Sequence, residues 1–317
     1  MATIDLEAEP PPTAWGVAVD EAAIGDWAIR WQGRRFDVPA FDYDGLPSWS
    51  GRPWFDFCGL SVSVVACLWA PEGGNEWAIR HEGRWLTDAP ALFASFQRRL
   101  GQAGPQGMVE QFLDFSEEDA AHMFSGRGTL QMVPARAVRL REVSAAVVTR
   151  WGGSFQHLVD EAGGDGPTVV RLLVSTVPGY RDEWDSEAGL LAFNKLGHLA
   201  TAMMSSRAPA PFARLDDFPV YADYMLPRVL RHMGILVYRP ELAVAVGGRR
   251  LIEPGSRWEL AIRWATLKAA HSLRTALNER GNRVTTPQLD YHLWWSSVLG
   301  PEADTMGEHH RTLTLAY

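Results

Sequence analysis

The sequence predicts a mainly α-helical protein with a minor β part near the N-terminus. From about residue 88 onward, helix-start signals and apolar residues at helical spacing recur along the chain. Before that point, residues 26–36 (DWAIRWQGRRF) and 76–86 (EWAIRHEGRWL) each alternate apolar and polar residues around a glycine, which is typical of a two-strand hairpin. There is no alternation of strands and helices, and the GxGxxG and GxxxxGK[ST] motifs are missing. A nucleotide-cofactor fold is therefore not expected.

The N-terminal part combines a tail, two hairpins and an apolar segment. Residues 1–14 are acidic and proline-rich, so we expect a mobile tail and no signal peptide. Residues 37–53, between the hairpins, are expected to form a loop. Residues 54–69 form a buried apolar segment in which β-branched residues favour a strand, although periodicity does not decide between strand and helix. We expect one domain over residues 15–317, with a β-containing part at 15–88 and a helical part at 89–317.

The remainder of the chain is a series of helices with identifiable start signals. Ser116 precedes an acidic first turn in the pattern of a capping box, Ser154 is a second cap, and Pro167 fits a first helical turn. Residues 178–186 are polar and predict a loop, and the final TLTLAY alternates as a strand does. The predicted helices span residues 90–100, 105–113, a segment starting at 116, 131–150, 154–163, 167–176, 189–206, 256–279 and 287–299.

Charge and cysteine content limit the classes of partner. The formal net charge of -8 argues against duplex DNA or an anionic membrane as the main partner, because neutralising phosphates requires clustered Lys and Arg. A small phosphorylated ligand requires only a few local cations. Cys58 and Cys67 fit no metal-binding or disulfide pattern, so we expect buried free thiols in a reducing cytoplasm. No apolar run is long enough to cross a bilayer. For the oligomeric state, a monomer is favoured.

One carboxylate stands out in an aromatic and apolar segment. Residues 218–238 read FPVYADYMLPRVLRHMGILVY, and Asp223 lies between Tyr221 and Tyr224. If the segment is helical, Pro227 belongs in its first turn or at a kink. Because a buried aspartate is costly without a partner, Asp223 is either a helix N-cap or a functional carboxylate, and the spacing favours neither.

Two further pairs have helical spacing. Lys195 and His198 lie three residues apart in the apolar stretch LLAFNKLGHLA, which raises the chance that this lysine meets an anion, although most helical lysines are solvated. Glu259 and Arg263 lie four residues apart, which more often marks a structural ion pair than a reactive one.

Aromatic and basic residues near the C-terminus supply other candidates. Asp290 and Trp294 lie four residues apart in QLDYHLWWSSV, as either a surface aspartate beside a core tryptophan or a clamp for a flat ring. His310 and Arg311 precede the alternating tail, and packing of that tail would hold both near a site.

Several segments together resemble the queuosine salvage protein family, the queuosine 5′-phosphate N-glycosylases. The resemblance runs in consistent order from about Gly83 to the C-terminus, and it is specific as a set. The segments are WGGSFQHLV, VPGYRDE, FNKLGHL, VYADYMLPRVLRHMGIL, ELAIR, LDYHLW and HHRTLTLAY.

The resemblance implies a hydrolase that cleaves the N-glycosidic bond of queuosine 5′-monophosphate and releases queuine for reinsertion into tRNA. It also implies a fold similar to the helical DNA glycosylases. On the matching positions, Asp223 is implied to be catalytic, Tyr221 to contact the base, and Asp290 and Trp294 to bind queuine. Three positions depart from the family pattern: Trp295 replaces a carboxylate, VVACLW replaces LNFxFW, and KLGH replaces KRAQ.

The implied chemistry needs no metal and no cofactor. Glycoside cleavage passes through an oxocarbenium-like sugar cation, which the Asp223 carboxylate would stabilise or attack. Queuine is a 7-deazaguanine, so hydrogen bonds to its other edges must assist its departure, and Asp290 is the candidate for this role. For the 5′-phosphate we expect Lys195, assisted by His198, Arg228 or Arg231. A nucleic-acid-directed N-glycosylase and a non-catalytic binding protein for a modified nucleoside remain as alternatives, and the charge of -8 speaks against the first.

Overall fold

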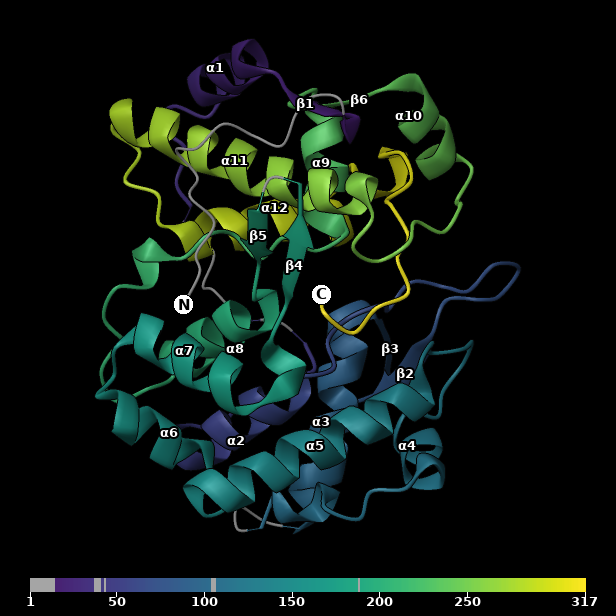
Figure 1. The fold of residues 1–317 in the computed structure, drawn as a ribbon, viewed down its shortest axis with the longest axis vertical. Coiled ribbons are helices and arrows are strands. Elements are labelled where there is room, and N and C mark those ends of the chain that lie inside the picture. The colour runs from purple at the N-terminus through teal and green to yellow at the C-terminus, as the bar shows by residue number, and fades with distance from the viewer. Residues whose placement is uncertain (1–14, 37–40, 43, 104–106, 188) are drawn as a thin grey trace. The chain divides into compact units, whose positions relative to one another are not determined.

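The computed structural model describes residues 15–36, 41–42, 44–103, 107–187 and 189–317, and this part of the chain is mainly helical (Figure 1). Twelve α-helices and three antiparallel two-stranded pairs occur in it, which confirms the predicted fold class. The chain divides into two compact units. The first unit comprises Met1–Ala40, Glu183–Phe193 and Asp216–Thr314, and the second comprises Phe41–Asp182, Asn194–Leu215 and Leu315–Tyr317. The prediction of one domain with a division near residue 88 stays a prediction, and the predicted tail over residues 1–14 lies outside the described residues.

The first unit is built on the long helix α11 (Arg257–Glu279). Helix α1 (Glu21–Arg30) packs on α11, and α9 (Met225–His232) packs on both α11 and α12 (Thr286–Val298) (Figure 1). The core between these helices is apolar, with Ile24, Leu260 and Leu289 buried in it. The unit also contains α10 (Pro240–Gly247), β1 (Val17–Val19) paired with β6 (Leu236–Tyr238), and β4 (Glu183–Ser186) paired with β5 (Gly189–Ala192).

The second unit contains the only hairpin that was predicted correctly. Strands β2 (Ala78–His81) and β3 (Arg84–Thr87) pair within the predicted stretch 76–86. The Ser116 side chain accepts from Asp119 N and Asp119 accepts from Ser116 N, which confirms the capping box. The helices of this unit are α2 (Gly51–Val62), α3 (Asp88–Ala103), α4 (Glu117–Met123), α5 (Val133–Trp151), α6 (Phe155–Ala162), α7 (Gly166–Thr176) and α8 (Lys195–Ser206).

The hairpin predicted at residues 26–36 is wrong, because residues 26–30 are the second half of helix α1 (Glu21–Arg30) and residues 31–36 form a turn and irregular structure. Asp20 caps that helix, since its Oδ1 accepts from Ala23 N at 3.0 Å. Ile24 and Ala28, four residues apart, are the buried positions, so the decisive spacing is that of a helix and not of a strand. The similarity between residues 26–36 and 76–86 therefore has no structural counterpart.

Three other segments differ from expectation. Residues 54–69, for which a strand was favoured, are helical as far as Val62 in α2. The end of the loop predicted at 178–186 forms β4, and the start of the helix predicted at 189–206 forms β5, so that this helix is present only from Lys195 onward, as α8. The C-terminal alternating segment TLTLAY (residues 312–317) is not a strand, and the isolated bridge beside it joins Leu251 to Arg311, the residue before the segment. Of the helix predicted at 105–113, residues 105 and 106 lie outside the described part and only Glu110–Phe112 is helical, as a short 3-10 turn.

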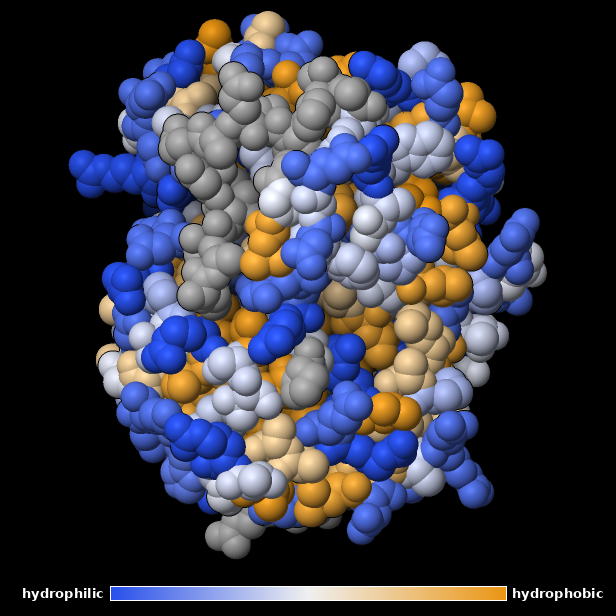
Figure 2. All heavy atoms as spheres, in the orientation of Figure 1, coloured by the Kyte–Doolittle hydropathy of each residue, from blue (hydrophilic) through white to orange (hydrophobic). Residues whose placement is uncertain are grey.

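The state of the cysteines and the mixed polarity of the surface agree with the sequence composition. Cys58 and Cys67 are both free and buried, as predicted. On the face drawn in Figure 2, hydrophobic residues form small groups between hydrophilic ones, which is ordinary for a protein surface in water. Among the described residues, no helix is long and apolar enough to cross a membrane.

Candidate functional site

Asp223 lies two residues before the first residue of helix α9 (Met225) and is half-buried. Its Oδ1 accepts from Met225 N at 2.7 Å and from Leu226 N at 2.9 Å, so this carboxylate satisfies two of the N–H groups at the start of the helix. Pro227 occupies the first turn, as expected. A negative charge at this place is stabilised by the positive end of the helix dipole. Asp223 therefore caps α9, and its catalytic role, which capping does not exclude, stays a prediction.

Tyr221, two residues before Asp223, is hydrogen-bonded to Asp290. Tyr221 N donates to Oδ1 of Asp290 at 2.7 Å, and Asp290 is held on α12 with an exposed fraction of 7%. Burial, with a smaller contribution from the Asp290 carboxylate, raises the pKa of Tyr221 above its usual range, so its phenol is neutral. The structure thus brings Tyr221, Asp223 and Asp290 into one short loop and the helix face beside it.

The hydroxyl of Tyr221 is buried, and it has no hydrogen-bond partner among the described residues. A buried hydroxyl without a partner costs stability, so this hydroxyl is a candidate donor to a bound ligand or water. Trp294 lies one helical turn after Asp290, is half-buried, and has its ring centroid 6.0 Å from that of Tyr291. Trp295 is also half-buried. This is the position at which the family that the sequence resembles has a carboxylate.

We expect Tyr221→Phe to leave the free protein as stable as the wild type, or more stable by up to about 1 kcal/mol, because it removes only an unsatisfied buried group. The Michaelis constant should rise roughly tenfold if this hydroxyl donates to the substrate, a loss equal to about one hydrogen bond. Chemical denaturation and steady-state kinetics measure the two effects.

Tyr180→Phe is the matched control, because the Tyr180 hydroxyl is buried and donates to the carbonyl of Gly59. This variant should lose stability instead. A loss of stability in Tyr221→Phe equal to that in Tyr180→Phe would show that the Tyr221 hydroxyl has a partner within the protein.

Arg228 on α9 holds the chain that follows α12. Its guanidinium donates to the carbonyls of Ser297 (2.9 Å), Ala303 (2.8 Å), Met306 (3.1 Å) and Gly307 (2.8 Å). These contacts occupy four of its five N–H groups. The phosphate-binding role expected for Arg228 stays a prediction. The contacts of this side chain are those of a residue that fixes the conformation of the segment after α12.

Arg231 is more available than Arg228. It lies over the ring of Tyr238, with 4.4 Å from Cζ to the ring centroid, and makes one long hydrogen bond of 3.4 Å to the carbonyl of Glu308. The side chain is half-buried. Of the two arginines on α9, Arg231 is the better placed to retain donors for an anion.

His310 and Arg311 are held in the first unit. The carbonyl of Arg311 accepts from Ile252 N at 2.8 Å, and its guanidinium lies 3.7 Å from the Glu308 carboxylate. His310 is 1% exposed. Burial first, and then the charges of His309 and Arg263, lower the pKa of His310 to about 3. His310 is therefore neutral at neutral pH.

The lowered pKa of His310 predicts a loss of stability in acid. Below pH 6.5 the unfolded chain binds a proton at this residue and the folded chain does not, so the contribution is complete above 6.5 and is lost as the pH falls toward 3. The expected loss is about 1.4 kcal/mol per pH unit over that range. Relative to His310→Gln, the wild type should therefore lose stability in denaturant unfolding between pH 7 and pH 4.5. His232→Gln, at an exposed histidine, is the control, and a pH-independent difference between wild type and His310→Gln would contradict the prediction.

Lys195 and His198 belong to the second unit. Both are buried on the first turn of α8, and Nζ of Lys195 donates to the carbonyl of Val65 at 3.4 Å. Their predicted part in phosphate binding stays a prediction.

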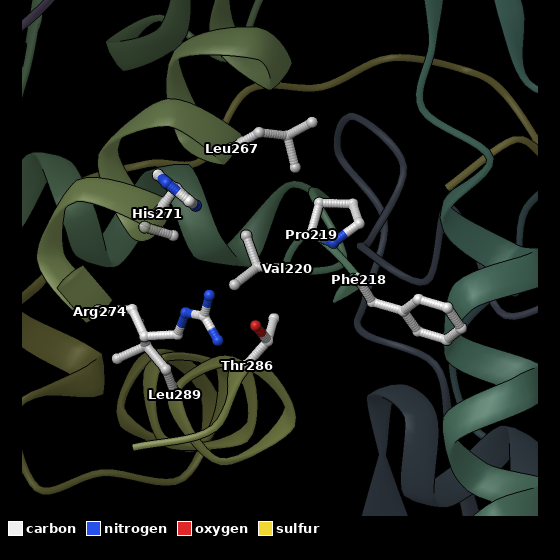
Figure 3. Close-up of a pocket in the computed structure, with 9 residues that line it drawn as sticks. Phe218, Pro219, Val220, Leu267, His271, Arg274, Thr286 and Leu289 are labelled. Atoms are coloured by element: carbon white, nitrogen blue, oxygen red, sulfur yellow. The ribbon is translucent and has the colours of Figure 1, made fainter. Parts of the chain in front are cut away.

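A cavity that the sequence did not indicate is lined by Phe218, Pro219 and Val220, the three residues before Tyr221 (Figure 3). The guanidinium of Arg274 and the side chain of Thr286 point toward Val220, which precedes Tyr221. The cavity measures about 10 Å³, on the order of one water molecule, so it has no room for a nucleobase. It is lined by Phe218, Pro219, Val220, Leu267, Ala270, His271, Arg274, Thr286 and Leu289.

Among the described residues, no three His, Cys, Asp or Glu side chains are grouped so as to hold a metal ion. The expectation that the protein uses no metal stays a prediction.

Comparison with known proteins identifies the relatives of this chain. The family model described as queuosine salvage protein matches residues 61–317. A queuosine 5′-phosphate N-glycosylase/hydrolase of Sphaerobacter thermophilus is 28% identical over 96% of this chain and 94% of its own length. Proteins of the same name from Mus musculus (27% identical, 74% of this chain and 73% of the relative) and Dictyostelium discoideum (25%, 83% and 84%) are also similar.

Proposed function

The chain belongs to the queuosine salvage protein family, and from this premise we propose that it hydrolyses the N-glycosidic bond of queuosine 5′-monophosphate and releases queuine. The family model matches residues 61–317, which include every segment that carries a candidate site residue, and the match to the bacterial relative spans almost the whole of both chains. The observation that carries the proposal in the structure is the loop in which Asp223 starts α9 while Tyr221 N binds Asp290. The substrate is a small molecule, and we propose that the protein acts as a cytoplasmic monomer without a cofactor or duplex DNA.

In the proposed mechanism Asp223 acts on the sugar. As the glycosidic bond breaks, positive charge develops at C1′, and a fixed carboxylate either stabilises this charge or forms a bond to the carbon before water attacks. The two backbone hydrogen bonds of Asp223 fix its carboxylate before substrate binds, so little reorganisation is needed during the reaction.

Asp290, Tyr221 and Trp294 act on the base. Oδ1 of Asp290 already accepts from Tyr221 N, so the same carboxylate that is proposed to receive N–H groups of queuine also fixes the backbone two residues before Asp223. Base recognition and placement of the catalytic carboxylate are thereby linked. Trp294 supplies a flat apolar surface for the ring.

Cations are proposed to bind the 5′-phosphate. Lys195 is the main candidate, with His198, Arg231 and Arg228 as further ligands, and His310 and Arg311 as contacts from the C-terminal segment. An ammonium or guanidinium paired with a phosphate makes a charge-assisted hydrogen bond, which is roughly twice as strong as a neutral one.

The test is a parallel incubation with queuosine, queuosine 5′-monophosphate and queuosine-containing tRNA, with free queuine detected by mass spectrometry. We expect release from the 5′-monophosphate and little from the other two. Release mainly from tRNA would assign a nucleic-acid-directed glycosylase. Binding of the monophosphate without any release would assign a binding protein.

A further inference from the structure

A second basic site lies in the second unit, between helices α3 and α4. Its cavity measures about 250 Å³ and is lined by Ser95, Arg98, Arg99, His122, Met123 and Ser125. The lining contains three basic side chains and no carboxylate. In a chain with a net charge of -8, such a local excess of positive charge is not expected from composition.

Helix geometry explains how the arginines reach one cavity. Ser95, Arg98 and Arg99 lie at positions i, i+3 and i+4 of α3, so they share one helical face. The far wall is the end of α4, where Ser125 N and Oγ both donate to the carbonyl of His122. This carbonyl is therefore satisfied and contributes less of the negative potential that the end of a helix normally presents.

The two guanidinium groups are held in place before any ligand binds. Nη2 of Arg98 donates to the carbonyl of Met123 at 2.9 Å. The Cζ of Arg99 lies 5.3 Å from the centroid of the Phe115 ring, and its Nη1 lies 4.0 Å from the Asp119 carboxylate. A fixed guanidinium loses less side-chain freedom when it binds an anion.

One donor in this cluster is unused. Within the ranges that the structure describes, Nε of Arg99 is buried and has no hydrogen-bond partner. The hydroxyl protons of Ser95 and Ser125 already go to the carbonyls of Ala91 and His122, so the donors for a ligand must come from the arginines and His122. Guanidinium donors are suited above all to phosphate and carboxylate.

We propose that this cavity binds a phosphate monoester, with Arg98 and Arg99 as the ligands of the phosphate. Two guanidinium groups can place parallel N–H donors on a phosphate, whose charge of about -1.5 to -2 balances theirs. Asp119 neutralises part of the charge of Arg99, but its other oxygen is fixed by Ser116, and it does not line the cavity. The volume lies below the ~300–1,000 Å³ of pockets for drug-sized molecules, so a phosphate with a small body fits. This proposal is independent of the proposed function.

The test follows the arginine Nε–H groups of the full-length protein by NMR during titration with ribose 5-phosphate and with inorganic phosphate. The Arg99 Nε–H signal, identified by its absence in Arg99→Gln, should shift downfield as it gains an acceptor. Ribose without phosphate should leave it in place. A signal that responds equally to chloride would mean an adventitious ion only, and would overturn the proposal.

Calorimetry supplies the second measurement. Arg98→Gln and Arg99→Gln should each weaken phosphate binding at this site by about tenfold, the loss of one charged hydrogen bond. Arg80→Gln, at an exposed arginine on β2, is the matched control and should bind as the wild type does. If loss of the Met123 or Phe115 contact unfolds the arginine variants, His122→Glu places a carboxylate in the lining from an exposed helical position and should abolish binding. Unchanged binding in a folded Arg98→Gln/Arg99→Gln or His122→Glu protein would refute the assignment, whatever the glycosidase assay shows.

Discussion

Asp223→Asn is expected to lower kcat for release of queuine from queuosine 5′-monophosphate by about 10²–10³-fold, the range found when one electrostatic contact to a transition state is removed. Asparagine keeps a side-chain oxygen that can accept from Met225 N and Leu226 N, so α9 should start at the same place. What is lost is the negative charge that faces the developing sugar cation. The Michaelis constant should change little, because the charge matters mainly in the transition state.

Two further variants separate charge from structure. Asp223→Ala removes both the charge and the cap, so it should lose activity as Asp223→Asn does and also about 1 kcal/mol of stability. Asp216→Asn removes an exposed carboxylate seven residues earlier and should retain wild-type kinetics. Wild-type rates in Asp223→Asn, measured by mass spectrometry of free queuine, would remove Asp223 from the mechanism and leave it as a helix cap.

The dual role of Asp223 shows what sequence can and cannot say about a site. Spacing alone left cap and functional carboxylate as equal alternatives, and the structure shows that the cap exists. The motif resemblance assigned Tyr221 and Asp290 to the base, but neither spacing nor motif indicated that the two are joined by a hydrogen bond. That contact links residues 69 positions apart in the sequence, and no local pattern reports such a pairing.

The same limit explains the errors in the fold. Residues 76–86 form a hairpin, whereas residues 26–30 of the similar stretch 26–36 belong to a helix, which Asp20 caps from six residues before that stretch. The β4–β5 pair was missed although its strands are as long as β2 and β3, because β4 reads EWDS and does not stand out from the polar residues around it. By contrast, Ser116 and Ser154 marked their helices correctly, since an N-cap is a local interaction between residues near in sequence. The four carbonyls that Arg228 binds were also beyond prediction, because they come from a segment about seventy to eighty residues away.

The largest expected effect on stability comes from Arg263. Glu259 and Arg263 are both fully buried on α11, with 3.3 Å between Nη1 and Oε1, which confirms the predicted structural ion pair. The guanidinium also lies 3.9 Å above the Phe193 ring, and Oε2 of Glu259 accepts from Gly255 N. Arg263→Met should lower the free energy of unfolding by about 3–5 kcal/mol, because it leaves a buried carboxylate without its cation. Chemical denaturation measures the loss.

A double variant tests whether the cause is the unpaired charge. Glu259→Gln/Arg263→Met removes both charges, and the introduced amide keeps an oxygen that can accept from Gly255 N, so this protein should be more stable than Arg263→Met alone. Arg150→Met breaks the partly exposed ion pair with Glu161 and should cost no more than about 1 kcal/mol. If the double variant proves less stable than Arg263→Met, the loss arises from the packing of the arginine on Phe193 rather than from a buried unpaired charge.

Helix α11 also packs on α9, at whose start Asp223 is fixed. The rank order of stability among these variants should therefore be repeated in their glycosidase activity, measured near the midpoint of denaturant unfolding.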